Sequence, residues 1–154
     1  MKFKNHKYPI IIHLTHIPEL NEISYEETGI RFGASVTLSE IDDIFQREIQ
    51  NQPEYKTRVF TAISEMLRWF AGKQIRNVAS VGGNIITGSP ISDLNPLFMA
   101  ANCELELKSK GNPNSSYTKN LLLAISILVS DNLIYAQLIA FQFNRAQTIP
   151  VLSI

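Results

Sequence analysis

Segment 70–85 constrains the fold of this chain more than any other stretch. It reads F-A-G-K-Q-I-R-N-V-A-S-V-G-G-N-I and follows apolar residues spaced as on one face of a helix. Two adjacent glycines, Gly82 and Gly83, stand between Ser80 and Asn84. Glycine permits a positive φ and a close approach of the backbone to a ligand. We therefore expect a helix that ends where this segment begins, followed by a turn that leads through the glycines.

The polar groups of this segment suit a phosphate-containing ligand. Successive backbone N–H groups in a glycine-rich turn form a concavity that fits phosphate oxygens. The Ser80 hydroxyl and the Asn84 amide add hydrogen-bonding groups for a phosphate or a ribityl chain. Lys73 and Arg76 either support a pyrophosphate or are simply solvated, since long cationic side chains mostly lie at the surface. A tight turn between a helix and a strand, with no ligand, is the alternative interpretation of adjacent glycines.

Two helices are expected ahead of this segment. The first opens at residues 37–39, with Ser39 and Asp42 as a weak capping box, and ends near residues 50–53. The second is the better defined, because its apolar residues recur at steps of three and four. The expected apolar face of the first helix consists of Ile41, Ile44, Phe45 and Ile49, and that of the second of Val59, Phe60, Ile63, Met66, Leu67, Trp69 and Phe70.

Alternation of apolar and polar residues predicts two strands. Residues 30–34 form the first, and residues 103–108 form an amphipathic second strand with Cys103 on its apolar side. Cys103 is assigned to core packing, because buried cysteine behaves as a small hydrophobe. Residues 23–29 are expected to form an acidic loop.

Charge and cysteine content exclude several classes of function. Fourteen Lys and Arg balance fourteen Asp and Glu, so there is no electrostatic case for binding nucleic acid. One cysteine permits neither an internal disulfide nor a cysteine-based metal site, and it suits a cytoplasmic location. His13 and His16 have the spacing H-x-x-H but lack a nearby third ligand, so no metal is expected.

Two segments carry a resemblance to a known family. F-A-G-K-Q-I-R-N-V-A-S-V-G-G-N-I-I-T and the later S-P-I-S-D-L-N-P resemble the flavin domain of xanthine dehydrogenase and aldehyde oxidase, a PCMH-type FAD-binding domain. Lys73 and Asn84 resemble the sequence of xanthine dehydrogenase more than that of aldehyde oxidase. The resemblance implies an α+β fold, a partial PCMH-type FAD-binding domain with a small mixed sheet and packed helices, and FAD as cofactor.

The resemblance also implies which residues bind FAD. Asp93 has two compatible roles: it suits the N-cap of a short helix starting at Leu94, and the resemblance implies that it binds the flavin nucleotide, for which sugar hydroxyls are suitable donors. The family has a lysine where this chain has Gln142, so a cation near the flavin is missing if the alignment holds. The cofactor-binding residues implied are Phe70, Ser80, Val81, Gly82, Gly83, Asn84, Asp93 and Leu128.

The resemblance weakens beyond about residue 108. Residues 1–110 are expected to be the central part of the FAD-binding domain, and residues 111–154 a divergent or truncated end of the same domain. The family's first pyrophosphate loop would lie upstream of residue 1. We interpret the chain as a fragment, a truncated gene product or a shortened paralogue.

Three functions compete at this point. The first is an FAD-binding segment of a xanthine dehydrogenase-type oxidoreductase that passes electrons from iron–sulfur clusters through FAD to NAD or oxygen. Molybdopterin and iron–sulfur clusters would belong to domains absent from this chain, which would be its partners, and a dimer is implied by resemblance. The second is a non-catalytic remnant that acts as an interaction module. The third is a membrane-associated protein that uses the apolar residues 121–143. Two buried strands, or a strand and a helix, explain the apolar pattern of these residues better than a membrane span does.

Overall fold

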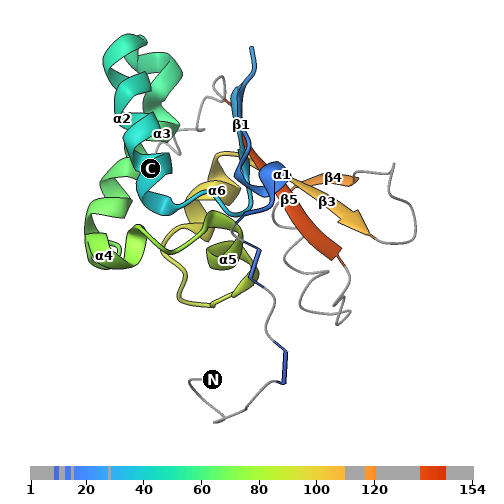
Figure 1. The fold of residues 1–154 in the computed structure, drawn as a ribbon. Helices are drawn as coiled ribbons and strands as arrows, with labels where there is room; N and C mark the ends of the chain where they lie inside the picture. Colours follow the sequence, from blue (N-terminus) through green and yellow to red (C-terminus); the bar gives the residue numbers. More distant parts are fainter. Residues whose placement is uncertain are drawn as a thin grey trace.

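The protein folds as an α+β domain in which helices pack against one antiparallel sheet (Figure 1). A computed structural model describes residues 9–10, 13–14, 16–27, 29–109, 117–120 and 136–144. The α+β class is as the sequence predicted. Among the described residues, no helix is long and apolar enough to cross a membrane.

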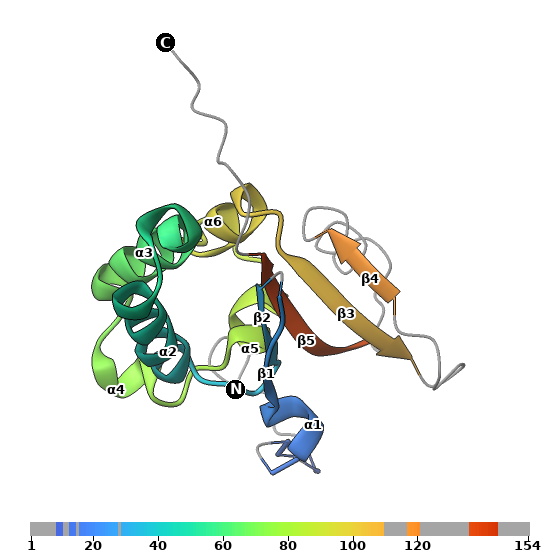
Figure 2. The same ribbon diagram turned by 90° about the horizontal axis from the view of Figure 1, so that it is seen from above.

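The sheet has five strands in the order β1-β2-β5-β3-β4. Every pairing between the described strands is antiparallel, whereas strands of mixed direction were expected. The last strand, β5, lies in the centre between β2 and β3 (Figure 2). Residues beyond position 110 therefore complete the sheet that the earlier residues begin. The strands are β1 (Ile23–Tyr25), β2 (Gly29–Gly33), β3 (Glu104–Ser109), β4 (Tyr117–Asn120) and β5 (Ala136–Asn144).

The first hairpin corrects the expected acidic loop over residues 23–29. Its first three residues form β1, which pairs with β2 from Ile23 opposite Phe32 to Tyr25 opposite Ile30. The loop prediction was wrong because Ile23 and its neighbours can pair with the next strand, which a local reading does not consider. The strand predicted over residues 30–34 is confirmed as β2.

A charged cluster joins strands on the sheet. Arg31 of β2 donates to the Glu106 carboxylate of β3, with an Nε–Oε2 distance of 3.1 Å. Glu22 lies 3.7 Å from the same guanidinium. Arg31 and Glu106 keep about a fifth of their side-chain surface exposed. Because β5 runs between them, this ion pair ties β2 to β3 across the central strand.

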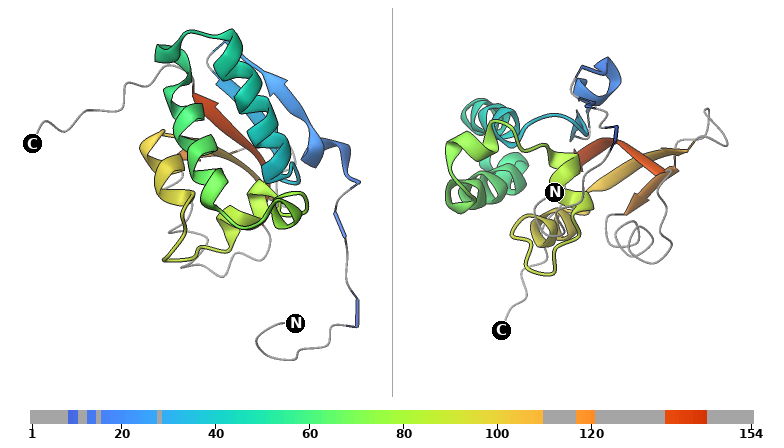
Figure 3. Two further views of the ribbon diagram at one scale, coloured as in Figure 1. Left: turned by 90° about the vertical axis from the view of Figure 1, so that its left-hand side faces the viewer. Right: turned by 60° about the horizontal axis from the view of Figure 1, so that its bottom comes forward.

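The two longest helices, α2 (Leu38–Asn51) and α3 (Glu54–Trp69), lie side by side on one side of the sheet (Figures 1 and 3). The cap of α2 differs from the prediction. Thr37 is the N-cap and forms a full capping box with Glu40, with Oγ1 accepting from the Glu40 N–H at 3.3 Å. Ser39 is already inside the helix, so its hydroxyl does not cap.

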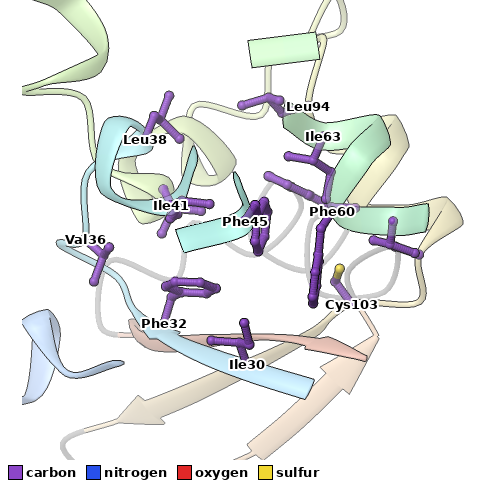
Figure 4. Packing of buried hydrophobic residues seen from close by; sticks show 14 of the residues in the cluster. Ile30, Phe32, Val36, Leu38, Ile41, Phe45, Phe60, Ile63, Leu94 and Cys103 are labelled. Carbon is purple, nitrogen blue, oxygen red and sulfur yellow. The ribbon is translucent and has the colours of Figure 1, made fainter. Parts of the chain in front are cut away.

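Three phenylalanine rings form the centre of the core (Figure 4). Phe45 of α2 stacks on Phe60 of α3 with centroids 4.5 Å apart, and it meets Phe32 of β2 edge-on at 5.8 Å. Cys103 is fully buried in the same cluster, as predicted. Trp69 was placed on the apolar face but is 82% exposed. The error has a simple cause, since two residues turn a helix by about 200° and move Trp69 away from the buried Leu67.

Candidate functional site

The two glycines lie in a helix. Residues 81–86 form the short helix α5 (Val81–Ile86), and Ser80 is its N-cap. The Ser80 Oγ accepts a hydrogen bond from the Gly83 N–H at 3.2 Å. The predicted ligand-binding loop, and the alternative of a turn into a strand, are both replaced by a helix start. Ser is a preferred N-cap, which explains why the helix begins at this point.

The backbone amides of this helix start are already paired. The Gly82 N–H donates to the Ala34 carbonyl at 3.0 Å, and the Asn84 N–H donates to the Ser80 carbonyl at 3.0 Å. The Gly83 N–H is held only by the Ser80 hydroxyl. The expectation that Gly82 and Gly83 offer bare amides to a diphosphate is therefore wrong for this conformation. Backbone donors that fold against protein carbonyls are satisfied by them.

Gly82 is needed for packing. A Cβ at this position would lie 2.8 Å from both the Cβ and the carbonyl oxygen of Ala34, closer than packed atoms allow. Its φ is not positive; among the described glycines, only Gly88 has a positive φ. The segment from β2 to α2 therefore runs against the start of α5. Two further bonds join the same segments, from the Val81 N–H to the Val36 carbonyl at 3.0 Å and from the Leu38 N–H to the Ala79 carbonyl at 2.9 Å.

Phe70 ends α3 at the edge of the same region. It is half-buried, and its N–H donates to the Met66 carbonyl at 3.0 Å. Arg76, at the end of α4 (Lys73–Arg76), donates from Nη1 to the Phe70 carbonyl at 2.8 Å and to the Ala71 carbonyl at 2.7 Å. Arg76 is thus neither simply solvated nor free to hold a phosphate with this nitrogen. Lys73 is exposed.

Asp93 is exposed and does not cap the following helix, α6 (Asn95–Ala100). The Ser92 hydroxyl accepts from the Asn95 N–H instead, at 3.2 Å. The N-cap role predicted for Asp93 is therefore wrong. Among the described residues, none forms a hydrogen bond or ion pair with the Asp93 carboxylate, so this carboxylate can accept hydrogen bonds from a ligand.

Two buried amide oxygens lack partners among the described residues. They are Oδ1 of Asn84 on α5 and Oδ1 of Asn95 on α6, and Asn95 is only 6% exposed. An unpaired buried acceptor costs about 1–3 kcal/mol, so such atoms mark places where a ligand donor can stabilise the fold. Asn84 was predicted as a site residue. Asn95 was missed, because an Asn before a Pro indicates a helix start and says nothing of burial.

Most of the predicted cofactor-binding residues lie within residues 70–95. We call this part of the molecule the site corner. Figure 1 shows α4 at one end of the helix pair and α5 between it and the sheet. Leu128 lies outside the described residues. Gln142 belongs to β5 and pairs with Arg31 on β2 and Glu104 on β3, in the middle of the sheet.

Electrostatics add no reactive group to the site corner. One titratable group among those described shows a clear shift: burial, with a contribution from Glu104, raises the pKa of the Cys103 thiol well above its ordinary value. Cys103 lies in the core. Among the described residues no group of three or more His, Cys, Asp or Glu could hold a metal ion. The site corner offers hydrogen-bond acceptors and donors, which suits binding of a ligand.

Comparison with known proteins identifies the class of protein to which this small antiparallel α+β domain belongs. The family described as "FAD binding domain in molybdopterin dehydrogenase" matches residues 1–135, and the chain belongs to this family.

Similar sequences within this family include xanthine dehydrogenases. The chain is 47% identical over 146 residues to a xanthine dehydrogenase/oxidase of Rattus norvegicus, a match that covers 89% of this chain and 11% of that protein. It is 52% identical over 109 residues to the xanthine dehydrogenase/oxidase of Gallus gallus, covering 71% of this chain and 8% of that protein. The resemblance found in the sequence is confirmed. The chain spans about a tenth of the length of these relatives.

Solved structures show the same fold. A carbon monoxide dehydrogenase from Hydrogenophaga pseudoflava aligns with a TM-score of 0.58 at 19% identity, over 86% of this chain and 42% of that one. A reconstituted CO dehydrogenase from Oligotropha carboxidovorans aligns with a TM-score of 0.54 at 20% identity, over 84% of this chain and 42% of that one. At this identity the likeness concerns the fold alone.

FAD is the cofactor of the family, and the residues present fit it in part. The buried Oδ1 of Asn84 has no donor among the described residues, and a sugar or ribityl hydroxyl would supply one. The exposed Asp93 carboxylate is free to accept hydroxyl hydrogens. The Gly82 amide does not fit the role of a phosphate donor, because Ala34 already occupies it.

Proposed function

We propose that this chain holds FAD in a xanthine dehydrogenase-type molybdo-flavoenzyme, in which electrons from iron–sulfur clusters pass through FAD to NAD or oxygen. When bound, FAD supplies the redox chemistry, and the protein supplies binding and orientation. The observation that carries the proposal is the buried Oδ1 of Asn84, which has no hydrogen-bond partner among the described residues, at a position where the family resemblance implied a cofactor contact.

The proposed contacts divide by chemistry. Asn84 and Asp93 accept hydrogen bonds from hydroxyl groups of the cofactor, and Phe70 contacts a ring system with its aromatic side chain. Ser80 shares its hydroxyl between the Gly83 N–H and the cofactor, because a hydroxyl has both donor and acceptor capacity. The start of α5, formed by Val81, Gly82 and Gly83, places Asn84. Leu128 is kept as a cofactor-binding residue because the resemblance implies it.

The rest of the enzyme is proposed from the family. Iron–sulfur and molybdenum domains would be the partners of this chain, a dimer the assembly, and the cytoplasm the location. We also propose that residues 1–110 form the central part of the FAD-binding domain and residues 111–154 a divergent end of it. The central position of β5 in the sheet supports placing both parts in one domain.

The test uses the full chain and two asparagines. Asn84→Leu removes the unmet acceptor while keeping the side-chain size. We expect FAD affinity, measured by flavin fluorescence titration, to fall about tenfold, the equivalent of about 1.4 kcal/mol. Without FAD the same variant should gain about 1 kcal/mol in unfolding free energy, since it no longer buries an unpaired oxygen. Asn51→Leu, at the exposed end of α2, is the matched control.

The outcomes separate the competing functions. Lower affinity together with higher stability for Asn84→Leu alone supports the proposal. Wild-type protein that binds no FAD but co-purifies with a full-length relative would instead identify an interaction module. Partition of the wild-type chain into detergent would indicate the membrane-associated alternative.

A further inference from the structure

The turn between α3 and α4 is closed by one guanidinium nitrogen. Nη1 of Arg76 donates to two successive carbonyl oxygens, those of Phe70 at 2.8 Å and Ala71 at 2.7 Å. Nη1 of arginine carries two hydrogens, so both are used in these bonds. Hydrogen bonds from a charged donor are stronger than neutral ones, and a cation also suits the negative end of a helix.

The backbone conformation at this turn needs such a contact. Ala71 has a φ of 49°, in the left-handed region that residues other than glycine rarely adopt. Phe70 is held from both sides, because its N–H donates to the Met66 carbonyl and its carbonyl accepts from Arg76. Removing Arg76 would leave the Phe70 and Ala71 carbonyls without this donor. The Phe70 side chain would then be held by its packing against the core and by the bond from its N–H to the Met66 carbonyl, without the contact that fixes its carbonyl.

We propose that Arg76 is a positioning residue for the cofactor: it fixes the backbone of Phe70 so that the phenyl ring meets a ring system of FAD. This inference rests on the proposed function, in which Phe70 contacts FAD. It changes the role that the sequence suggested for Arg76, from a cation that supports a pyrophosphate to one that acts through the carbonyls of the preceding turn.

A double-mutant cycle on the full chain tests the inference. Arg76→Met and Phe70→Leu are each expected to weaken FAD binding about tenfold, while the double variant is no weaker than Phe70→Leu alone, because both changes remove one interaction. Arg76→Lys retains a cation with several donors and should recover part of the loss. Arg58→Met, on the exposed face of α3, is the control and should bind as the wild type does. Circular dichroism confirms that each variant is folded.

The results distinguish failure of the inference about Arg76 from failure of the proposed FAD binding. The inference is overturned, and the proposed function left intact, if Phe70→Leu weakens FAD binding while a folded Arg76→Met does not. The same holds if the losses of the two variants simply add in the double variant. A wild-type chain that binds no FAD would overturn both. Equal loss for Arg76→Lys and Arg76→Met would also count against the inference, because a cationic donor at this position would then not restore the hold on the Phe70 carbonyl.

Discussion

The helix pair and the site corner are built by different interactions. Between α2, α3 and the sheet, stability comes from buried aromatic rings, among which Phe45 and Phe60 are stacked at 4.5 Å. In the site corner, short helices are held by directional hydrogen bonds, as from Gly82 to Ala34 and from Arg76 to Phe70. Burial of apolar surface has no preferred direction, whereas hydrogen bonds place individual atoms.

This difference explains where the molecule can accept a cofactor. A close-packed apolar core has no unmet polar group to offer. The site corner retains buried acceptors on Asn84 and Asn95 and an exposed carboxylate on Asp93. In the proposed function, the core is the rigid support and the site corner is the surface that would bind FAD. Four experiments can break or sharpen this comparison.

Truncation of a core ring should have the largest effect. Phe60→Ala is expected to lower the free energy of unfolding by about 3–5 kcal/mol, because it removes a ring that is 1% exposed and leaves a cavity. Urea denaturation without FAD measures it. Trp69→Ala, at an 82% exposed position, should stay within about 0.5 kcal/mol of the wild type. Equal losses of unfolding free energy for Phe60→Ala and Trp69→Ala would contradict the assignment of Phe60 to the core and Trp69 to the surface of α3.

The two glycines should respond differently to the same substitution. Gly82→Ala is expected to cost about 1–3 kcal/mol, since its Cβ would overlap Ala34. Gly83→Ala meets only the Ser80 hydroxyl at 3.0 Å and gains up to about 1 kcal/mol in helix propensity, so it should be nearly neutral. Thermal unfolding compares the pair. A larger loss at Gly83 would contradict the packing assigned to α5.

The N-cap of α2 in the helix pair and the N-cap of α5 in the site corner allow a matched comparison. Ser80→Ala and Thr37→Ala should each cost about 1 kcal/mol of stability, as loss of an N-cap does. Only Ser80→Ala is expected to weaken FAD binding, because Thr37 caps α2. Paired denaturation and fluorescence titrations measure both quantities. Equal effects on affinity would show that stability, and not the site corner, controls binding.

The smallest effect concerns the core thiol. Burial raises the pKa of Cys103 above its ordinary value of about 9, so the unfolded chain loses this proton first as pH rises. The contribution is absent below about pH 9, and stability falls as pH rises above it. Urea denaturation at about pH 7 and about pH 10 measures the change, and Cys103→Ala should reduce it. An unchanged pH dependence in Cys103→Ala would contradict the assignment.

Several features were predictable from local pattern alone. The apolar spacing that ends at Phe70 predicted α3, and alternation predicted β2 and the strand after Cys103. Such patterns can be recognised in the sequence because helices and strands repeat at fixed periods. The segments at 70–87 and 89–96 predicted the family, which the comparisons confirm.

The errors concern hydrogen-bond partners that residue type alone does not select. Nothing near Gly82 indicates that Ala34 will accept its amide hydrogen, and nothing near Arg76 indicates that its guanidinium will turn back to two carbonyls. Asp93 and Ser92 are both good caps by residue type, and only the geometry of the turn selects Ser92.

By itself the sequence determined the two long helices α2 and α3, the strands β2 and β3, the buried thiol and the family, because each depends on residue order over a short span. Only the tertiary structure decided that β5 enters the centre of the sheet and that α5 begins against Ala34. It also decided that the Asn84 oxygen has no hydrogen-bond partner in the part of the chain that the structure describes. These depend on which distant groups meet, and a hydrogen bond forms only where donor and acceptor are brought to the same place.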